Sequence, residues 1–340
     1  MHRTFDEGPF HCTVEGPFAF PDHAASTFGT MNDTRSPWRR RWRWLIGTGA
    51  FLVLVEVVLR VGYGFCDAVL MRADPNYEYI AQPSQDRHRF GHRITYNSLS
   101  MRSEEPDSTA IIVLGCGDSV INGGSLTDND SLATSLLCTA LTGALGRPVQ
   151  VLNISAGSWG PDNCAAYLAN TRLPKAAALV LFVSSHDAHD NMSFKNVVGV
   201  RKHFPDEQYI SAIVELVDRY GWPRFFKPAT TAEEELGIDK GEAGFNTGFA
   251  ALKHYADERG IPMLMYLHAE RSEIKAGHYN EQGQEIIRFA ETNGIPLIRD
   301  LDHGATAVEL RDGIHPGNAG QRRIARALEP TLVEVLSGTR

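Results

Sequence analysis

Residues 110–119 read AIIVLGCGDS, an unbroken apolar run that ends in Gly117, Asp118 and Ser119. Apolar runs of this kind, without polar alternation, are typical of strands buried on both faces of a parallel sheet. Similar apolar runs follow at residues 149–153, 178–183, 262–267 and 296–299. Helical patterns separate them, and this alternation predicts an α/β fold whose parallel sheet has helices on both faces.

The expected helices cover residues 131–145, 162–171, 245–259, 282–292 and 317–336. Two of them end in Gly-Ile-Pro, at 260–262 and 294–296, where glycine suits the position after the last helical residue. Residues 189–240 are expected to form an irregular insertion with one helix at 207–220.

Polar side chains follow the strands of this predicted sheet. Ser119 follows the first strand, Ser158 the second and His186 the third. The motif DGIHP, which contains Asp312 and His315, lies in the loop before the last helix. Ligands bind at the carboxyl ends of parallel strands, so we expect these side chains to meet at one edge of the sheet.

Three of these residues have the chemistry of a serine hydrolase. A serine hydroxyl is a weak nucleophile at neutral pH and needs an adjacent base, for which His315 is the candidate. Asp312, three residues earlier, can orient the imidazole and stabilise its charged form. The order Ser119, Asp312, His315 therefore predicts an enzyme that acts on esters.

Two sequence blocks resemble the SGNH/GDSL hydrolase superfamily. Gly117-Asp118-Ser119 matches its nucleophile block, and DGIHP at residues 312–316 matches its last block. The resemblance covers roughly residues 108–338 and implies a flavodoxin-like three-layer α/β/α sandwich. It implies esterase, lipase, deacetylase, thioesterase or O-acetyltransferase activity, with no metal and no organic cofactor.

The second family block, a glycine that donates a backbone N–H to the oxyanion, is altered. The segment after the second strand places Ser158 in that slot, with Gly157 beside it as an alternative. A backbone N–H survives the change, so we expect the N–H groups of Ser119 and Ser158 to form part of the oxyanion hole.

The third family block, Gly-x-Asn-Asp, reads Ser-Ser-His-Asp at residues 184–187. His186 is the candidate to donate a ring N–H in place of the family asparagine, with Asn163 and Asn191 as alternatives. The simpler hypothesis is that His186 and Asp187 only brace their loop.

Two further residues are candidates for substrate binding. Trp159 can stack on a sugar ring or belong to the core, and Asp187 can contact substrate. His186, Asp187, His189 and Asp190 form a cluster of metal-ligand types, but no distant partner completes it, so we expect no metal site.

An arginine-rich stretch followed by an apolar run predicts a membrane anchor at residues 36–65. The 22 residues from Trp44 to Phe65 are enough to cross about 30 Å of hydrocarbon. Arginines before the run predict a cytoplasmic N-terminus. A cleaved signal peptide lacks a suitable cleavage site here, and a buried soluble helix would not need the Arg and Trp cluster.

The remaining segments have simpler expectations. We expect a disordered cytoplasmic tail at 1–35, with Met31 as an alternative start, and a polar, loop-like juxtamembrane lead-in at 66–107. The net charge of −8 argues against nucleic-acid binding. The five cysteines are interpreted as free thiols, with a Cys138–Cys164 disulfide as the alternative.

The sequence thus predicts an inner-membrane protein with an extracytoplasmic SGNH-type esterase domain at residues 108–340. Its expected substrate is an acyl ester, such as an O-acetyl group on an envelope or exported polysaccharide. A polysaccharide O-acetyltransferase is one alternative, and a weakly catalytic glycan-binding or scaffolding module is another. Polysaccharide-export machinery is the expected partner.

Overall fold

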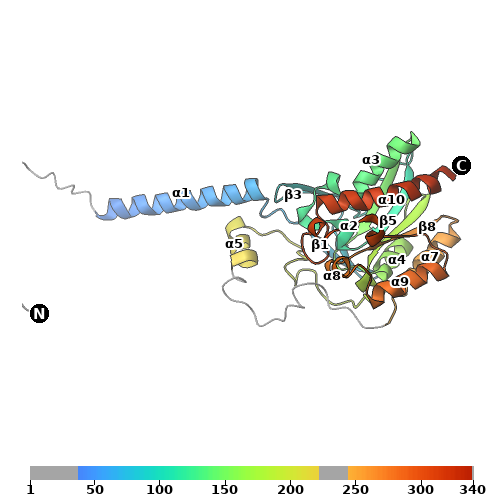
Figure 1. The fold of residues 1–340 in the computed structure, drawn as a ribbon. Coiled ribbons are helices and arrows are strands. Elements are labelled where there is room, and N and C mark those ends of the chain that lie inside the picture. Colours follow the sequence, from blue (N-terminus) through green and yellow to red (C-terminus); the bar gives the residue numbers. More distant parts are fainter. Residues whose placement is uncertain (1–36, 222–243, 339–340) are drawn as a thin grey trace, which may run out of the picture. The chain divides into compact units, whose positions relative to one another are not determined.

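Five parallel strands form the central sheet of the computed structural model, which describes residues 37–221 and 244–338 (Figure 1). They are β5 (Ile111–Gly117), β6 (Val149–Ser155), β7 (Ala178–Ser184), β8 (Met263–His268) and β9 (Leu297–Arg299). The strand order is β6-β5-β7-β8-β9, with every pair parallel. This is the flavodoxin-like order, so the predicted fold class is confirmed.

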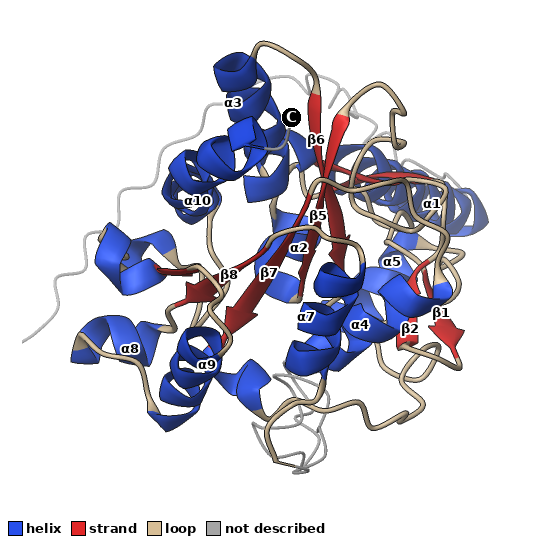
Figure 2. Cartoon of the chain, turned by 90° about the vertical axis from the view of Figure 1, so that its right-hand side faces the viewer, coloured by secondary structure: helices blue, strands red, loops and turns tan. Residues whose placement is uncertain are grey.

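Helices cover both faces of the sheet (Figure 2). One face carries α3 (Ala133–Leu145) and α10 (Asn318–Gly338), and the other carries α4 (Pro161–Asn170), α7 (Gly248–Glu258) and α9 (Glu281–Thr292). Successive side chains of β5 point to opposite faces, so Val113 packs with the α3–α10 layer and Leu114 with the other. Each strand is therefore buried on both sides, as its unbroken apolar sequence predicts.

Short helices occupy the loops at the ends of the strands. They include α2 (Ser119–Asn122), α5 (Ala212–Leu216) with a π-helical turn at Val217–Gly221, and α8 (Arg271–Ala276). The helix expected at 207–220 is therefore shorter than predicted. The sequence patterns also missed α8, which is only six residues long.

The segment at residues 66–107 is not loop-like, and that expectation is wrong. It contains two antiparallel hairpins, β1 (Met71–Asp74) with β2 (Glu78–Ala81) and β3 (Gln85–Arg89) with β4 (His92–Tyr96). Tyr79, Ile94 and Met101 are fully buried in the same core as β5 and β6. The strands are four or five residues long, too short for a clear alternation in sequence.

The described residues contain one helix, Trp38–Tyr63 of α1 (Pro37–Tyr63), that is long and apolar enough to cross a membrane. None of its most apolar stretch is buried, so the alternative of a buried soluble helix is wrong. The predicted pair between Glu56 and Arg60 forms at 2.7 Å. The expected tail at 1–35 lies outside the described residues.

The described cysteines are free thiols. Cys138 lies on α3 and Cys164 on α4, which cover opposite faces of the sheet. The alternative of a disulfide between them is therefore wrong, and the interpretation as free thiols is confirmed for these two residues.

Candidate active site

The end of β5 places a serine at the carboxyl edge of the sheet. A Cβ at Gly117 would lie 2.9 Å from the carbonyl oxygen of Phe182, so only glycine allows this approach to β7. Asp118 then caps α2, since its Oδ1 accepts the N–H of Val120 at 2.9 Å. Ser119 is the first residue of α2, where backbone N–H groups have no intrahelical partner.

The structure brings the three predicted hydrolase residues together. The Oγ of Ser119 lies 3.0 Å from Nε2 of His315, and Nδ1 of His315 lies 2.8 Å from Oδ2 of Asp312. Because Nδ1 faces a carboxylate, it carries the hydrogen and leaves Nε2 free to accept the serine proton. This is the hydrogen-bond relay of a serine nucleophile, its base and the orienting carboxylate.

Asp312 is held in its ionised form by its own loop. Partial burial raises the pKa of this carboxyl, but the backbone N–H groups of Ile314 and His315 and the His315 ring outweigh it, and the pKa is lowered. The two N–H groups donate to Oδ1 at 2.9 and 2.8 Å, which leaves Oδ2 for the imidazole. The short DGIHP turn therefore fixes both members of the Asp–His pair.

Arg271, at the start of α8, holds the outer side of this catalytic loop. Its backbone N–H donates to the carbonyl of Gly313 at 2.8 Å, and its Nε donates to the carbonyl of Asp312 at 2.8 Å. Its Nη2 donates to the carbonyl of Leu310 at 3.2 Å. Arg271 thus holds three backbone carbonyls of the loop that carries the Asp–His pair.

A buried histidine holds the inner side of the same loop. His268 ends β8 with 1% of its side chain exposed, and its Nε2 donates to the carbonyl of Ile314 at 2.7 Å. Its Nδ1 lies 2.9 Å from Oδ2 of Asp300, which is fully buried after β9. Asp300 in turn pairs with Arg323 of α10. The position of the residue before His315 is therefore set from inside the domain.

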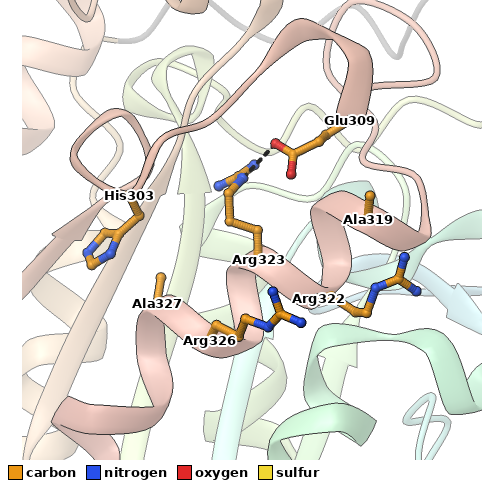
Figure 3. A pocket seen from close by; sticks show the side chains of 7 residues that line it. All are labelled: His303, Glu309, Ala319, Arg322, Arg323, Arg326 and Ala327. Carbon is orange, nitrogen blue, oxygen red and sulfur yellow. Dashed lines mark hydrogen bonds and ion pairs between the residues drawn. The ribbon is translucent and has the colours of Figure 1, made fainter.

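Figure 3 shows the cavity on the α10 side of this network. It has a volume of about 490 Å³ and is lined by His303, Glu309, Ala319, Arg322, Arg323, Arg326 and Ala327. Arg323 pairs with Glu309 at 2.8 Å, which ties α10 to the turn that precedes the catalytic loop. Ser119, Asp312 and His315 do not line this cavity, which is therefore separate from the candidate active site.

The turn after β6 contains Gly157 and Ser158, the two residues expected in the second family block. Within the described part of the chain, neither Gly157 nor Ser158 uses its N–H in a hydrogen bond, while the hydroxyl of Tyr79 holds their carbonyls at 2.8 and 3.3 Å. Ser158 has a φ of 58°, in the left-handed region. Glycine adopts this backbone readily, which explains the family glycine in this slot.

His186 lies near Asp118, the residue before Ser119. Its Nε2 is 4.0 Å from Asp118, 3.8 Å from Asp187 and 3.9 Å from Asp190, and its Nδ1 is 3.0 Å from Glu270. Burial opposes a charge on the ring, but these carboxylates outweigh it and raise its pKa to about 10. At neutral pH the ring is therefore an imidazolium with 36% of the side chain exposed.

Asp118, His186 and Asp187 offer ligand atoms within 4.8 Å of one another and are the described residues that can hold a metal ion. The sequence missed Asp118 as the distant member of this cluster. Nε2 of His186 lies 4.0 Å from Asp118 and 3.8 Å from Asp187, beyond hydrogen-bond distance, and among the described residues the buried Oδ1 of Asp187 has no hydrogen-bond partner.

Both alternative asparagines are already committed to the fold. The side-chain N–H groups of Asn163 go to Glu78 at 2.8 Å and to the Tyr77 carbonyl at 3.2 Å. Those of Asn191 go to the carbonyls of His189 and Gly244, both at 3.0 Å. Neither has a donor left for an oxyanion, so these alternatives are wrong.

The two expected substrate-binding residues are also structural. Trp159 is 1% exposed and donates its indole N–H to the Tyr79 carbonyl at 2.8 Å, so it cannot stack on a sugar. Asp187 is 1% exposed and accepts the N–H of Ser184 at 2.7 Å, so it braces the turn after β7. Only the bracing role that the sequence left open for Asp187 agrees with this burial.

Sequence reasoning missed Arg271, His268, Asp300 and Glu270. Three of them follow a rule that was available, because His268 ends β8, Glu270 follows it and Asp300 follows β9 at the carboxyl edge. No local motif distinguishes them from other polar residues of the chain. Arg271 acts through its carbonyl contacts, which only the folded loop creates.

Comparisons with known proteins give matches among solved structures only; no family model and no curated protein matches the chain. It shares 18% identity with TesA over 66% of this chain and 99% of the other, with a TM-score of 0.41. A lipase/acylhydrolase from Enterococcus faecalis is 14% identical over 66% of this chain and 96% of the other, with a TM-score of 0.40. A carbohydrate acetylesterase family member from Sinorhizobium meliloti is 18% identical over 67% of this chain and 99% of the other, with a TM-score of 0.35.

These matched structures each cover about two thirds of this chain. At such low identity and TM-score they say nothing about the activity of this chain. The strand order and the Ser119–His315–Asp312 contacts define the class on their own: an α/β protein with a hydrolase-type triad at the carboxyl edge of its sheet.

Proposed function

We propose that the chain is a serine ester hydrolase of the SGNH type. The observation that carries the proposal is the continuous relay from Ser119 through His315 to Asp312, with contacts of 3.0 and 2.8 Å. The residues come from opposite ends of the domain, so their alignment is a property of the fold and not of local sequence. General base catalysis of this kind contributes about 10²–10⁴-fold to a rate.

The acylation step follows from the relay. The Oγ of Ser119 attacks the acyl carbonyl carbon while its proton passes to Nε2 of His315, and the carbonyl π electrons move to oxygen. The N–H groups of Ser119 and Ser158 and the charged ring of His186 are the donors that stabilise this oxyanion. Collapse of the intermediate breaks the bond to the alcohol oxygen, which takes the proton from His315.

Deacylation repeats the same steps with water. His315 removes a proton from water, hydroxide adds to the acyl carbon, and Ser119 leaves with the proton returned by His315. The products are a free carboxylate and the restored enzyme. An added hydroxyl compound in place of water would give acyl transfer, so the acceptor that reaches the acyl-enzyme decides between hydrolase and transferase.

The proposed substrate is an O-acetyl group on an envelope or exported polysaccharide. The site is open, since 35% of the His315 side chain and 55% of the Asp312 side chain are exposed, which suits a group carried on a large molecule. The arginines in the first two turns of α1 favour a cytoplasmic N-terminus and an extracytoplasmic catalytic domain. Polysaccharide-export machinery is the corresponding partner class.

The test uses the full chain in detergent or nanodiscs with a chromogenic acetyl ester. Wild type releases acetate and Ser119→Ala does not, whereas Ser135→Ala, a serine of α3, behaves as wild type. Adding an oligosaccharide acceptor then separates acetate release from acetylation of the acceptor. Equal turnover by wild type and Ser119→Ala would contradict the proposal.

A further inference from the structure

The segment of residues 210–221, which contains α5 and the π-helical turn, has an unusual distribution of exposed and buried side chains. Its apolar side chains face outward: Ile210 is 95% exposed, Val214 56% and Val217 51%. One of its two acidic residues faces inward, because the Glu215 side chain is fully buried, while the Asp218 side chain is 41% exposed. Soluble proteins normally bury apolar side chains and expose carboxylates, so this arrangement is the reverse of the usual one.

Buried contacts fix the segment in this orientation. Glu215 pairs with Arg89 at 2.5 Å, and the Arg89 side chain is only 3% exposed. The other carboxylate oxygen of Glu215 accepts the N–H of Cys66 at 2.6 Å, and Arg219 approaches Glu215 at 3.4 Å. A rotation that hid Val214 would carry Glu215 away from Arg89 and leave the buried Arg89 without its ion-pair partner, which is strongly unfavourable.

The same segment is attached directly to α1. The Glu56 carboxylate accepts hydrogen bonds from the Ser211 hydroxyl at 2.9 Å and from the N–H groups of Ala212 and Ile213 at 2.8 and 3.0 Å. Arg60 donates to the carbonyl of Ile210. Glu56 is seven residues before the end of α1, about 10 Å along a helix with a rise of 1.5 Å per residue.

The apolar face of the segment continues that of α1. Val57, Val58 and Val61, within one turn of Glu56 or Arg60, are 49, 47 and 84% exposed. Tyr220 at the end of the segment and Lys202, paired with Asp218, are residues suited to the headgroup layer. A bilayer that surrounds α1 therefore reaches Ile210, Val214 and Val217 without a further partner.

We propose that residues 210–217 insert into the outer interfacial layer of the membrane as a second lipid contact beside α1. The proposal rests on the proposed role of α1 as the anchor and goes beyond it. The recognised chemistry is the apolar boundary between headgroups and acyl chains, with no specific headgroup. Two contacts, unlike one helix, restrict rotation of the catalytic domain relative to the membrane.

Nitroxide labels on the full chain in nanodiscs test the inference, with the native cysteines replaced. Labels are placed at Ile210→Cys and Val214→Cys, at Leu54→Cys within α1, and at Val308→Cys, a 92% exposed valine near the catalytic loop. Collision with oxygen reports lipid, and collision with a soluble nickel complex reports water. We expect labels at 210 and 214 to favour oxygen, as at 54, and the label at 308 to favour nickel.

The outcomes separate this inference from the anchor. If the label at 54 is in lipid while the labels at 210 and 214 are in water like the label at 308, the inference is overturned and the anchor stands. If the label at 54 is also in water, both the inference and the anchor are overturned. In a Val214→Asp/Val217→Asp variant the label at 210 should move to water while 54 stays in lipid. Turnover of a soluble ester should not change, because neither valine belongs to the site.

Discussion

The catalytic loop with Asp312 and His315 and the turn with His186 both approach the Asp118–Ser119 pair, but they are held in opposite ways. The loop exposes its charges and is fixed through its carbonyls by Arg271 and His268. The turn gathers carboxylates around one imidazole and is fixed by charge. Backbone clamping sets the geometry of proton transfer, whereas clustered carboxylates set the charge of a donor.

The largest expected effect is on the loop side. His315→Gln should lower kcat by on the order of 10⁴-fold, because Ser119 loses its base, while the fold is retained. Hydrolysis of a chromogenic acetyl ester measures the effect, and His303→Gln, an exposed histidine outside the relay, serves as the control. A His315→Gln enzyme with near-normal kcat would contradict the relay.

The matching change on the turn side should have a smaller effect. His186→Leu should lower kcat by about 10²–10³-fold with little change in KM, because leucine has no N–H to donate to the oxyanion. The control is His189→Leu at the next histidine of the same turn, which pairs with Glu285 at 2.9 Å. Equal behaviour of the two variants would show that His186 only braces the turn.

Clamping of the loop can be weakened without touching the relay. Arg271→Met should lower kcat by about 10- to 100-fold, because the Asp312 and Leu310 carbonyls lose their side-chain donor and the relay drifts from alignment. The rate of fluorophosphonate labelling of Ser119 should fall in parallel while KM stays unchanged. Arg299→Met, which removes a surface pair with Asp302, is the control. Unchanged labelling would contradict a positioning role.

The positive charge of His186 should also make the free energy of unfolding depend on pH. Its pKa in the fold, about 10, lies above the ordinary value of 6.5. Its ion pairs therefore stabilise the fold fully below pH 6.5, and this contribution is lost as the pH rises through about 10. In urea unfolding, the stability difference between wild type and His186→Gln should shrink between these pH values. A difference that grows with pH would contradict the charged ring.

The smallest effect concerns the altered second block. Ser158→Gly should raise the free energy of unfolding by up to about 1 kcal/mol, because the left-handed backbone costs a non-glycine residue about 1–2 kcal/mol and glycine loses about 0.4–1 kcal/mol more entropy on folding. Activity should persist because the N–H remains. Ser158→Ala, which keeps a Cβ, should show no such gain; an equal gain would contradict backbone strain as the cause.

Sequence alone predicts the parts of this molecule that depend on short-range pattern. Apolar strands gave the sheet, and the three-residue spacing of Asp312 and His315 gave the Asp–His pair. The convergence of strand ends predicted that the turn after β7 lies near the end of β5, and His186 lies 4.0 Å from Asp118. Burial of Trp159 and the engagement of Asn163 depend on packing against β2, a hairpin strand that the sequence pattern did not reveal.

The same limit applies to the clamp around the loop. Arg271 contacts Leu310 and Asp312, about 40 positions away in the chain, through carbonyl oxygens that every residue possesses. Such contacts leave no residue-type signature, so only the fold shows them. The inverted face of α5 is similar, because its meaning depends on the burial of Glu215 against Arg89.

The central claim is that Ser119 is a nucleophile activated by His315. Treatment of the full chain with a fluorophosphonate, followed by mass spectrometry of the peptide that contains residue 119, tests it most directly. If His315 activates Ser119, we expect one covalent adduct on Ser119 in wild type, much slower labelling in His315→Gln and no labelling in Ser119→Ala. An unmodified Ser119, or an adduct on another serine that persists in Ser119→Ala, would contradict it.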